Sequence, residues 1–258
     1  PAEGVKLARI VGLQNELALA LAAESIRIEA PIPGKSLVGV EVPNRGKATV
    51  GLASMLSDEK FRTSPKPLTI ALGKGLSGKP VFANLGKMPH ALIAGTTGSG
   101  KSVTIHSIIT SLLFRNSPED LRLIFVDPKR VELTLYNGIP HLLTPVITDA
   151  KKCILALKWA AKEMDRRYDI LEGHAVRDIT SYHEKIRGTK AKNEDEKAPE
   201  HMPFIVIIID ELADIMQTYP RELESAIVRL AQMSRAVGIH LILSTQRPSV
   251  NVITGLIK

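Results

Sequence analysis

Cysteine, aromatic residues and long apolar runs are all scarce in this sequence of 258 residues. The one cysteine, Cys153, rules out a disulfide framework within the chain, and its place in a helical pattern favours a core thiol over a nucleophile. Aromatic residues make up 4% of the chain, so stacking of bases on exposed rings is disfavoured as a way to bind nucleic acid. The longest purely apolar run, Phe204 to Ile209, is far too short to span a bilayer. Because the chain begins at Pro1, with nothing that resembles a signal peptide, we expect a piece of a longer protein.

Positive charge, in contrast, is in excess. The formal net charge is +7, which favours a polyanionic partner. The share of hydrophobic residues, 44%, is typical of a globular protein and sufficient for a substantial core.

A glycine-rich loop carries the clearest signal. It fits the pattern of Gly, four residues, Gly-Lys and then Ser or Thr, in which backbone N–H groups turn inward onto the phosphates of a nucleoside triphosphate. The residues that we expect to bind this nucleotide are Gly95, Thr96, Thr97, Gly98, Ser99, Gly100, Lys101, Ser102 and the adjoining Val103. Lys101 would reach the β- and γ-phosphates, and the hydroxyl of Ser102 would ligate Mg²⁺.

The segments on either side supply the context that this loop needs. Residues 91–94 have the pattern of a short buried strand, and apolar residues from Val103 to Leu113 recur at helical spacing. Strand, loop and helix together place a helix N-terminus, with its free N–H groups, under the phosphates. A glycine-rich turn that carries a lysine by chance would lack these flanks, so we interpret the segment as a nucleotide site.

A second segment predicts the other half of this site. The apolar strand Phe204 to Ile209 ends in Asp210 and Glu211, which places both acids at the carboxyl edge of a sheet, where ligands bind in such folds. Asp210 would hold Mg²⁺ through a water, and Glu211 would orient and polarise the attacking water. A glutamate at this position indicates an ATPase, because a glutamine often positions the water in GTPases. The alternative is a strand that ends in solvated acids.

Two further residues each have two interpretations. Gln246 follows the predicted strand Ile239–Ser244, where its amide could contact the γ-phosphate or simply end a polar strand. Arg235 ends the predicted helix Arg221–Ala236, where it could stabilise the helix end or reach a neighbouring subunit's γ-phosphate as an arginine finger. Spacing alone leaves the choice for Arg235 open.

The pattern from Met88 onward predicts an α/β fold. Strands, among them residues 121–126, alternate with helices, which is typical of a parallel sheet covered by helices. The helix predicted over Ile154–Leu171 has Arg167 among the residues assigned to its solvated side. The charged segment Lys185–Glu200, with Lys190 and Lys192, is predicted to be a surface loop.

The residues before this alternation predict a smaller domain. A helix over Val5–Ala23 and strands over Ser25–Ala30 and Ser36–Val42 precede the linker Thr63–Pro67. We therefore predict a small domain over residues 1–65 and a larger one over 66–258.

One segment imitates the phosphate loop. Residues 73–80 nearly repeat its spacing, but Pro80 replaces the hydroxyl residue and removes a backbone N–H. A strand pattern follows, so we predict a β-hairpin turn.

Several longer motifs follow one another along the chain. They are Met88-Pro89-His90, the loop itself, Asp127-Pro128-Lys129, Ile139-Pro140-His141-Leu142-Leu143, Asp210-Glu211-Leu212-Ala213-Asp214, and Gly238-Ile239-His240 leading into Thr245-Gln246-Arg247-Pro248-Ser249. In this order, over roughly residues 25 to 258, they resemble the FtsK/SpoIIIE family of bacterial DNA translocases.

The resemblance implies both a fold and an activity. The fold would be a RecA-like P-loop NTPase of the ASCE type, with a mainly parallel sheet flanked by helices, preceded by a small α+β domain. The two parts would be the α domain and the RecA-like β domain of a motor, the latter incomplete at Lys258. The activity would be ATP hydrolysis with Mg²⁺, coupled to translocation of double-stranded DNA through a homo-oligomeric, hexameric ring during chromosome segregation and cell division.

The resemblance also bears on residues and location. It favours Gln246 as a sensor of the γ-phosphate and Arg235 as the trans arginine finger, beside Lys101 and Glu211 in the catalytic set. DNA would be held by its phosphate backbone with little reading of sequence. The region would be cytoplasmic, and family members are usually anchored in the inner membrane at the division septum through N-terminal segments absent from this chain.

Two other functions stay open. One is a related ring ATPase that pumps conjugative or secretion substrates. The other is a nucleotide-gated scaffold with little hydrolysis, against which the intact Lys101, Asp210 and Glu211 argue.

Overall fold

The computed structural model describes residues 4–44, 46, 48–187 and 199–257. The chain divides into two compact units, residues 1–50 and 51–258. Of the predicted loop Lys185–Glu200, residues 188–198, which include Lys190 and Lys192, lie outside the described residues.

The first unit contains two short helices, α1 (Leu7–Val11) and α2 (Gln14–Ala20), and an antiparallel pair of strands, β1 (Arg27–Glu29) and β2 (Gly39–Glu41). The prediction of one helix over residues 5–23 is therefore wrong. The helical ladder breaks at Leu13, whose N–H donates to the carbonyl three residues back, at Ile10, instead of four. A glycine at position 12 costs about 1 kcal/mol relative to alanine inside a helix, which favours the break at this point.

The second unit begins with two short helices, α3 (Leu52–Leu56) and α4 (Glu59–Arg62), and the antiparallel hairpin β3 (Thr69–Lys74) and β4 (Pro80–Asn84). The hairpin predicted at residues 73–80 is confirmed. The domain boundary predicted near residue 65 falls inside this unit. The reason is packing, because Met55, Leu56 and Phe61 of the two helices form one apolar cluster with Ala71 of β3.

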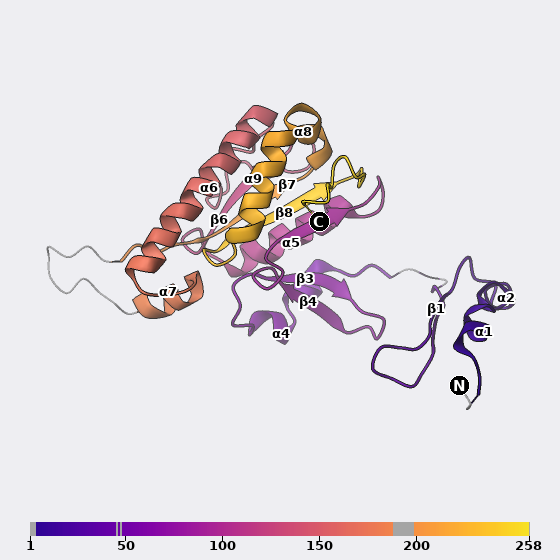
Figure 1. The fold of residues 1–258 in the computed structure, drawn as a ribbon. Helices are drawn as coiled ribbons and strands as arrows, with labels where there is room; N and C mark the ends of the chain where they lie inside the picture. The colour runs from indigo at the N-terminus through magenta and orange to yellow at the C-terminus, as the bar shows by residue number, and fades with distance from the viewer. Residues whose placement is uncertain (1–3, 45, 47, 188–198, 258) are drawn as a thin grey trace. The chain divides into compact units, whose positions relative to one another are not determined.

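The central sheet has four parallel strands in the order β5-β8-β7-β6, which confirms the predicted fold class (Figure 1). The strands are β5 (Ala91–Ala94), β6 (Leu121–Val126), β7 (Phe204–Ile209) and β8 (Ile239–Thr245). The strand β8 lies between the strand that enters the glycine-rich loop and the strand that ends in the two acids. This is the additional strand of the ASCE type, and it places three carboxyl ends side by side.

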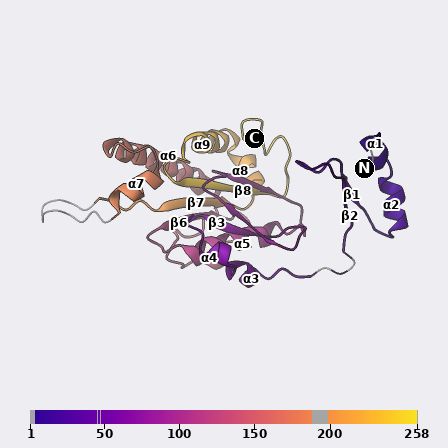
Figure 2. The same cartoon turned by 90° about the horizontal axis from the view of Figure 1, so that it is seen from below.

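The two faces of the sheet bury alternate side chains. Ile205, Ile207 and Ile209 of β7 pack with α6 (Ala150–Gly173), α8 (Leu212–Thr218) and α9 (Pro220–Met233). Val206 and Ile208 of the same strand pack toward α5 (Lys101–Arg115) on the other face. Figure 2 shows the resulting layers, with α6 and α9 on one side of β7 and β8 and with α5 on the other.

The remaining helices are α7 (Ile179–Ile186) and a short 3₁₀ turn, η1 (Thr134–Tyr136). Within the described residues, no helix is both long and apolar enough to cross a membrane. Cys153 of α6 is fully buried, and this burial raises the pKa of its thiol to about 12, which fits a core thiol.

Arg167 of α6 corrects the prediction of a solvated side. Its side chain is 2% exposed, its Nε donates to Glu163 Oε1 at 2.8 Å, and its Nη1 donates to the carbonyl of Val237 at 2.9 Å. Helical spacing cannot show that the segment before β8 covers this position. Burial tends to lower the pKa of Arg167, while Glu163 favours its charged form.

We expect Arg167→Ala to lower the free energy of unfolding by about 2 to 3 kcal/mol, because the change leaves the buried carbonyl of Val237 without its donor and removes a large buried side chain, while Glu163 keeps its hydrogen bonds to Arg166. The control is Arg229→Ala, whose ion pair with Asp165 is 53% and 49% exposed, so its loss should cost less than about 1 kcal/mol. Urea unfolding followed by circular dichroism measures both values. Equal costs for the two variants would contradict the structural role given to Arg167.

Candidate nucleotide site

The glycine-rich loop connects β5 to α5 and depends on its glycines. A Cβ at Gly95 would lie 2.2 Å from Ser99 Oγ, so a larger residue would collide with the loop's own side chain. Gly98 and Gly100 have φ values of +80° and +92°, which L side chains rarely adopt. The sequence folds here as a tight loop because Gly98 and Gly100 supply backbone conformations that glycine adopts far more readily than other residues.

The loop delivers a helix N-terminus suited to anions. The helix α5 begins at Lys101, its N-cap residue Gly100 makes no side-chain cap, and its first turn contains no acidic residue. Its first N–H groups and the positive end of its dipole are therefore free of competing carboxylates. Val103, in the first turn, is 69% exposed. This cradle fits the phosphates of a nucleotide.

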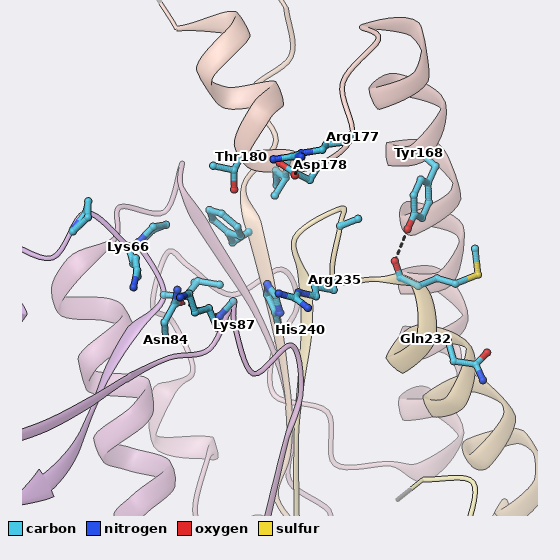
Figure 3. Close-up of a pocket in the computed structure, with 18 residues that line it drawn as sticks. Lys66, Asn84, Lys87, Tyr168, Arg177, Asp178, Thr180, Gln232, Arg235 and His240 are labelled. Atoms are coloured by element: carbon cyan, nitrogen blue, oxygen red, sulfur yellow. Dashed lines mark hydrogen bonds and ion pairs between the residues drawn. The ribbon is translucent and has the colours of Figure 1, made fainter. Parts of the chain in front are cut away.

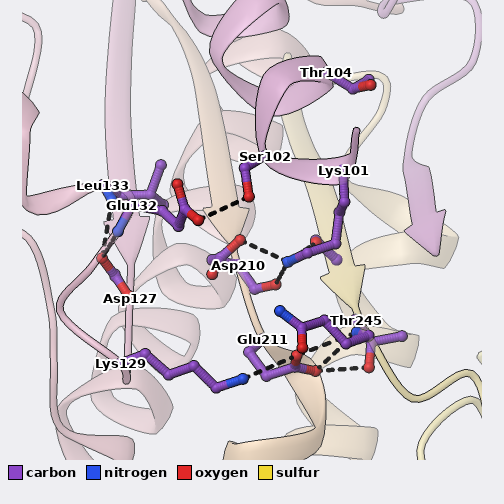
Figure 4. Close-up of polar contacts among 12 residues, drawn as sticks. Lys101, Ser102, Thr104, Asp127, Lys129, Glu132, Leu133, Asp210, Glu211 and Thr245 are labelled. Carbon is purple, nitrogen blue, oxygen red and sulfur yellow. Dashed lines mark hydrogen bonds and ion pairs between the residues drawn. The ribbon is translucent and has the colours of Figure 1, made fainter. Parts of the chain in front are cut away.

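Lys101 links three elements at the centre of the site (Figure 4). Its buried Nζ donates to Asp210 Oδ1 at 2.8 Å, to the carbonyl of Asp210 at 2.9 Å and to Ser244 Oγ at 3.0 Å. Burial raises the pKa of Asp210, and the neighbouring Lys101 partly offsets this effect. The predicted pairing of the loop with the acid at the end of β7 is thus present.

Glu211 is held as an anion by donors from β8. Its Oε1 accepts from Thr245 Oγ1 at 2.7 Å, and its Oε2 accepts from the backbone N–H of Gln246 at 3.1 Å and lies 3.5 Å from Lys129 Nζ. Burial pushes the pKa of Glu211 upward, but these hydrogen bonds and the charge of Lys129 outweigh it, and the pKa is lowered. An ionised, immobilised carboxylate of this kind can accept a hydrogen bond from a water at the site.

The magnesium ligands predicted from the sequence also come together. Ser102 follows Lys101 on α5, and its hydroxyl donates to Glu132 Oε1 at 2.8 Å, beside Asp210. Asp127, at the end of β6, is fully buried, and its Oδ1 has no hydrogen-bond partner among the described residues. These hydroxyl and carboxylate oxygens fit Mg²⁺, which in nucleotide sites takes one or two protein ligands together with phosphates and water.

Arg235 lies apart from this group. Arg235 precedes the first residue of β8, whereas Thr245 ends that strand and Gln246 follows it. A strand of seven residues is about 23 Å long, so Arg235 is far from Glu211. Arg235 instead lines a cleft of about 650 Å³ at the opposite edge of the sheet, together with Lys66, Lys87 and Arg177 (Figure 3). The structure therefore brings Lys101 and Asp210 together, with Glu211 and the backbone of Gln246 beside them, and places Arg235 away from them.

Four residues in contact with the site had no role in the sequence analysis: Lys129, Glu132, Ser244 and Thr245. Ser244 and Thr245 belong to β8, and Lys129 and Glu132 follow β6. The available signal was the apolar strand at residues 121–126, since the carboxyl end of each parallel strand meets the same edge of the sheet.

The strand order, the glycine-rich loop on α5 and the paired acids define a P-loop protein with the fold of the ASCE ATPases. The comparisons give the family. Residues 51–250 match the FtsK/SpoIIIE family, and residues 1–44 match the FtsK alpha domain. The chain belongs to the FtsK/SpoIIIE family, as the motifs predicted.

Curated relatives match the whole chain. It is 56% identical over 258 residues to the DNA translocase FtsK of Caldanaerobacter subterraneus subsp. tengcongensis and 54% identical over 258 residues to that of Campylobacter jejuni. The match covers 100% of this chain but 35% and 26% of these proteins. The chain thus spans about a third or less of their length.

Solved structures share the fold at lower identity. The pCW3 conjugation coupling protein TcpA, in its monomer form with ATPgS, is 26% identical with a TM-score of 0.65 over 98% of this chain and 68% of that one. The cytoplasmic domain of the type VII secretion ATPase EccC of Thermomonospora curvata is 26% identical, with a TM-score of 0.66 over 81% of this chain and 26% of that one.

We expect Gly100→Ala to weaken the binding of a fluorescent ADP analogue at least about tenfold, or about 1.4 kcal/mol, because a φ of +92° strains an L side chain and the loop must distort to relieve it. The matched control is Gly173→Ala at the end of α6, where a Cβ would meet nothing within 4 Å. Fluorescence titration gives both affinities. Unchanged binding by a folded Gly100→Ala variant would contradict the assignment of the cradle as the nucleotide site.

Proposed function

We propose that this chain is the motor region of an ATP-driven translocase of double-stranded DNA that acts in chromosome segregation during cell division. One observation carries the proposal. Lys101, Asp210 and Glu211 meet at one edge of the sheet, in a chain that is 56% identical along its length to a protein named DNA translocase FtsK.

The site residues divide the work of ATP hydrolysis. The glycine-rich loop and Lys101 bind the β- and γ-phosphates of ATP, and Ser102 and Asp210 hold Mg²⁺. The bound Mg²⁺ neutralises charge on the phosphates. Glu211, ionised and fixed by Thr245 and Lys129, orients the attacking water, and Gln246, whose backbone N–H donates to Glu211, senses the γ-phosphate.

The position of Arg235 bears on how the subunits assemble. Arg235 lies at the opposite edge of the sheet from its own loop, so it serves catalysis only by reaching the nucleotide of a neighbouring subunit. We therefore propose a homo-oligomeric ring, hexameric as the family resemblance implies, in which Arg235 is the trans arginine finger.

The larger assembly completes the proposal. The matches to the FtsK alpha domain and to the FtsK/SpoIIIE family support a small α domain followed by a RecA-like β domain. The excess of positive charge supports phosphate contacts with duplex DNA. The region acts on the cytoplasmic side, and attachment to the membrane at the septum would come from segments outside this chain.

A second function has one observation in its favour. TcpA and EccC, both 26% identical, are named for conjugation and for secretion, so a ring ATPase for such substrates is the alternative. The higher identity to proteins named DNA translocase favours duplex DNA.

We expect long linear duplex DNA to stimulate ATP turnover, because translocation consumes ATP only while the track is bound. The DNA concentration for half-maximal stimulation should rise at least about tenfold between about 50 and 200 mM salt, as phosphate contacts are screened. Phosphate release assays measure turnover, with Lys101→Ala as the blank that fails to bind nucleotide and Glu211→Gln as the blank that binds but does not hydrolyse. Turnover indifferent to DNA, or stimulated by a polypeptide instead, would favour the alternative.

We expect mixtures of Arg235→Ala and Lys101→Ala subunits to recover part of the DNA-stimulated turnover that each lacks alone. At about a quarter of randomly formed interfaces, an intact Lys101 site faces an intact Arg235. Turnover should return at these interfaces, because an arginine finger has a large effect on the rate. Mixing Arg235→Ala with Lys101→Ala/Arg235→Ala is the matched control, since it restores no interface. No recovery in the first mixture would refute the trans role of Arg235.

A further inference from the structure

The turn that follows β6, residues Asp127–Leu133, contacts both halves of the nucleotide site. Its Glu132 accepts from the hydroxyl of Ser102, and its Lys129 lies 3.5 Å from Glu211. We refer to this segment as the β6 turn. Neither the loop motif nor the paired acids give Glu132 a role.

The β6 turn is built to hold Glu132 in place. Asp127, fully buried at its start, accepts through Oδ2 from the backbone N–H groups of Glu132 at 2.9 Å and Leu133 at 2.8 Å. Arg130 has a φ of +59°, which reverses the chain toward this carboxylate. Leu133 is fully buried in the core beneath α5, so Glu132 is anchored from both sides.

Both oxygens of the Glu132 carboxylate have partners on α5. Oε1 accepts from Ser102 at 2.8 Å, and Oε2 lies 3.4 Å from Nε2 of His106, one helical turn further along. The other ring nitrogen of His106, Nδ1, lies 2.8 Å from the hydroxyl of Tyr136. The carboxylate is therefore fixed in direction as well as in position.

The chemistry of a hydroxyl gives this contact its meaning. A serine hydroxyl has one proton to donate and two lone pairs to offer. When the proton points to a carboxylate, the lone pairs turn to the other side, where a cation can be bound, and an ionised acceptor strengthens the arrangement. The Ser102 hydroxyl donates to Glu132, whereas the Oδ1 atom of Asp210 accepts from Lys101.

We propose that Glu132 is a positioning residue that orients the hydroxyl of Ser102 toward the divalent cation bound with the nucleotide. The inference rests on the nucleotide and magnesium site proposed at Ser102. It predicts that Glu132 affects the affinity for the cation far more than the affinity for the nucleotide itself.

The experiment measures binding of a fluorescent ADP analogue in EDTA and across a Mg²⁺ titration. We expect Glu132→Ala to raise the Mg²⁺ concentration for half-maximal tightening by about 10- to 100-fold, and Glu132→Gln, which keeps a neutral acceptor, by less. Binding in EDTA should change less than about twofold in both, because the phosphate cradle is untouched. The matched control is Glu119→Gln, an exposed residue between α5 and β6, which should leave both values unchanged.

The outcomes separate this inference from the proposed function. Unchanged Mg²⁺ dependence in folded Glu132→Ala, or equal losses with and without Mg²⁺, would overturn the positioning role. If the Ala variant does not fold, the nearly isosteric Gln variant carries the test. A wild-type chain that binds the nucleotide without any effect of Mg²⁺ would instead overturn the magnesium site itself, and the inference with it.

Discussion

The structure of the site depends on one buried ion pair, between Lys101 and Asp210. Lys101 comes from the helix that opens the phosphate cradle, Asp210 from the end of β7, and Ser244, the third acceptor of Nζ, from β8. A buried ammonium without such partners would be costly, so the pair requires the loop, the acidic strand end and the additional strand to meet at one point. The same contacts fix the start of α5, where the next residue, Ser102, donates its hydroxyl proton to Glu132.

The place of β8 between β5 and β7 explains the state of Glu211. Because β8 runs alongside β7, Thr245 and the backbone of Gln246 reach the glutamate, and these two donors, together with the charge of Lys129, lower its pKa in spite of burial. With β8 elsewhere in the sheet, Glu211 would lose the donors from Thr245 and Gln246 and keep the backbone N–H of Ala213 and the ammonium of Lys129, so its pKa would rise. Strand order therefore favours the ionised form of the residue that we assign to the attacking water.

The features that were predicted correctly are those that depend on residues close together in the sequence. The loop from Gly95, the strands and the hairpin at residues 73–80 follow from local spacing and are found in the structure. The burial of Arg167 and the contact of Glu132 with Ser102 could not be predicted from the sequence. Arg167 has the spacing of a solvated position but is covered by the segment at Val237, and Glu132 lies in a charged turn that reverses onto Ser102 only because Asp127 binds its backbone. Both depend on long-range packing that no periodicity records.

The strand β8 also bears on how sites in a ring would communicate. Its carboxyl end, at Thr245, donates to Glu211, to which we assign the attacking water, and Arg235 lies four residues before its first residue, Ile239. The strand is buried along its whole length and hydrogen-bonded to a neighbour on each side, so it can shift only as part of the sheet. In a ring where Arg235 serves the next nucleotide, a change at one nucleotide that moves Glu211 would be transmitted through this rigid strand to the arginine at the other edge. Sequential firing of neighbouring sites would then need no separate signalling element, because the catalytic strand itself joins one nucleotide to the next.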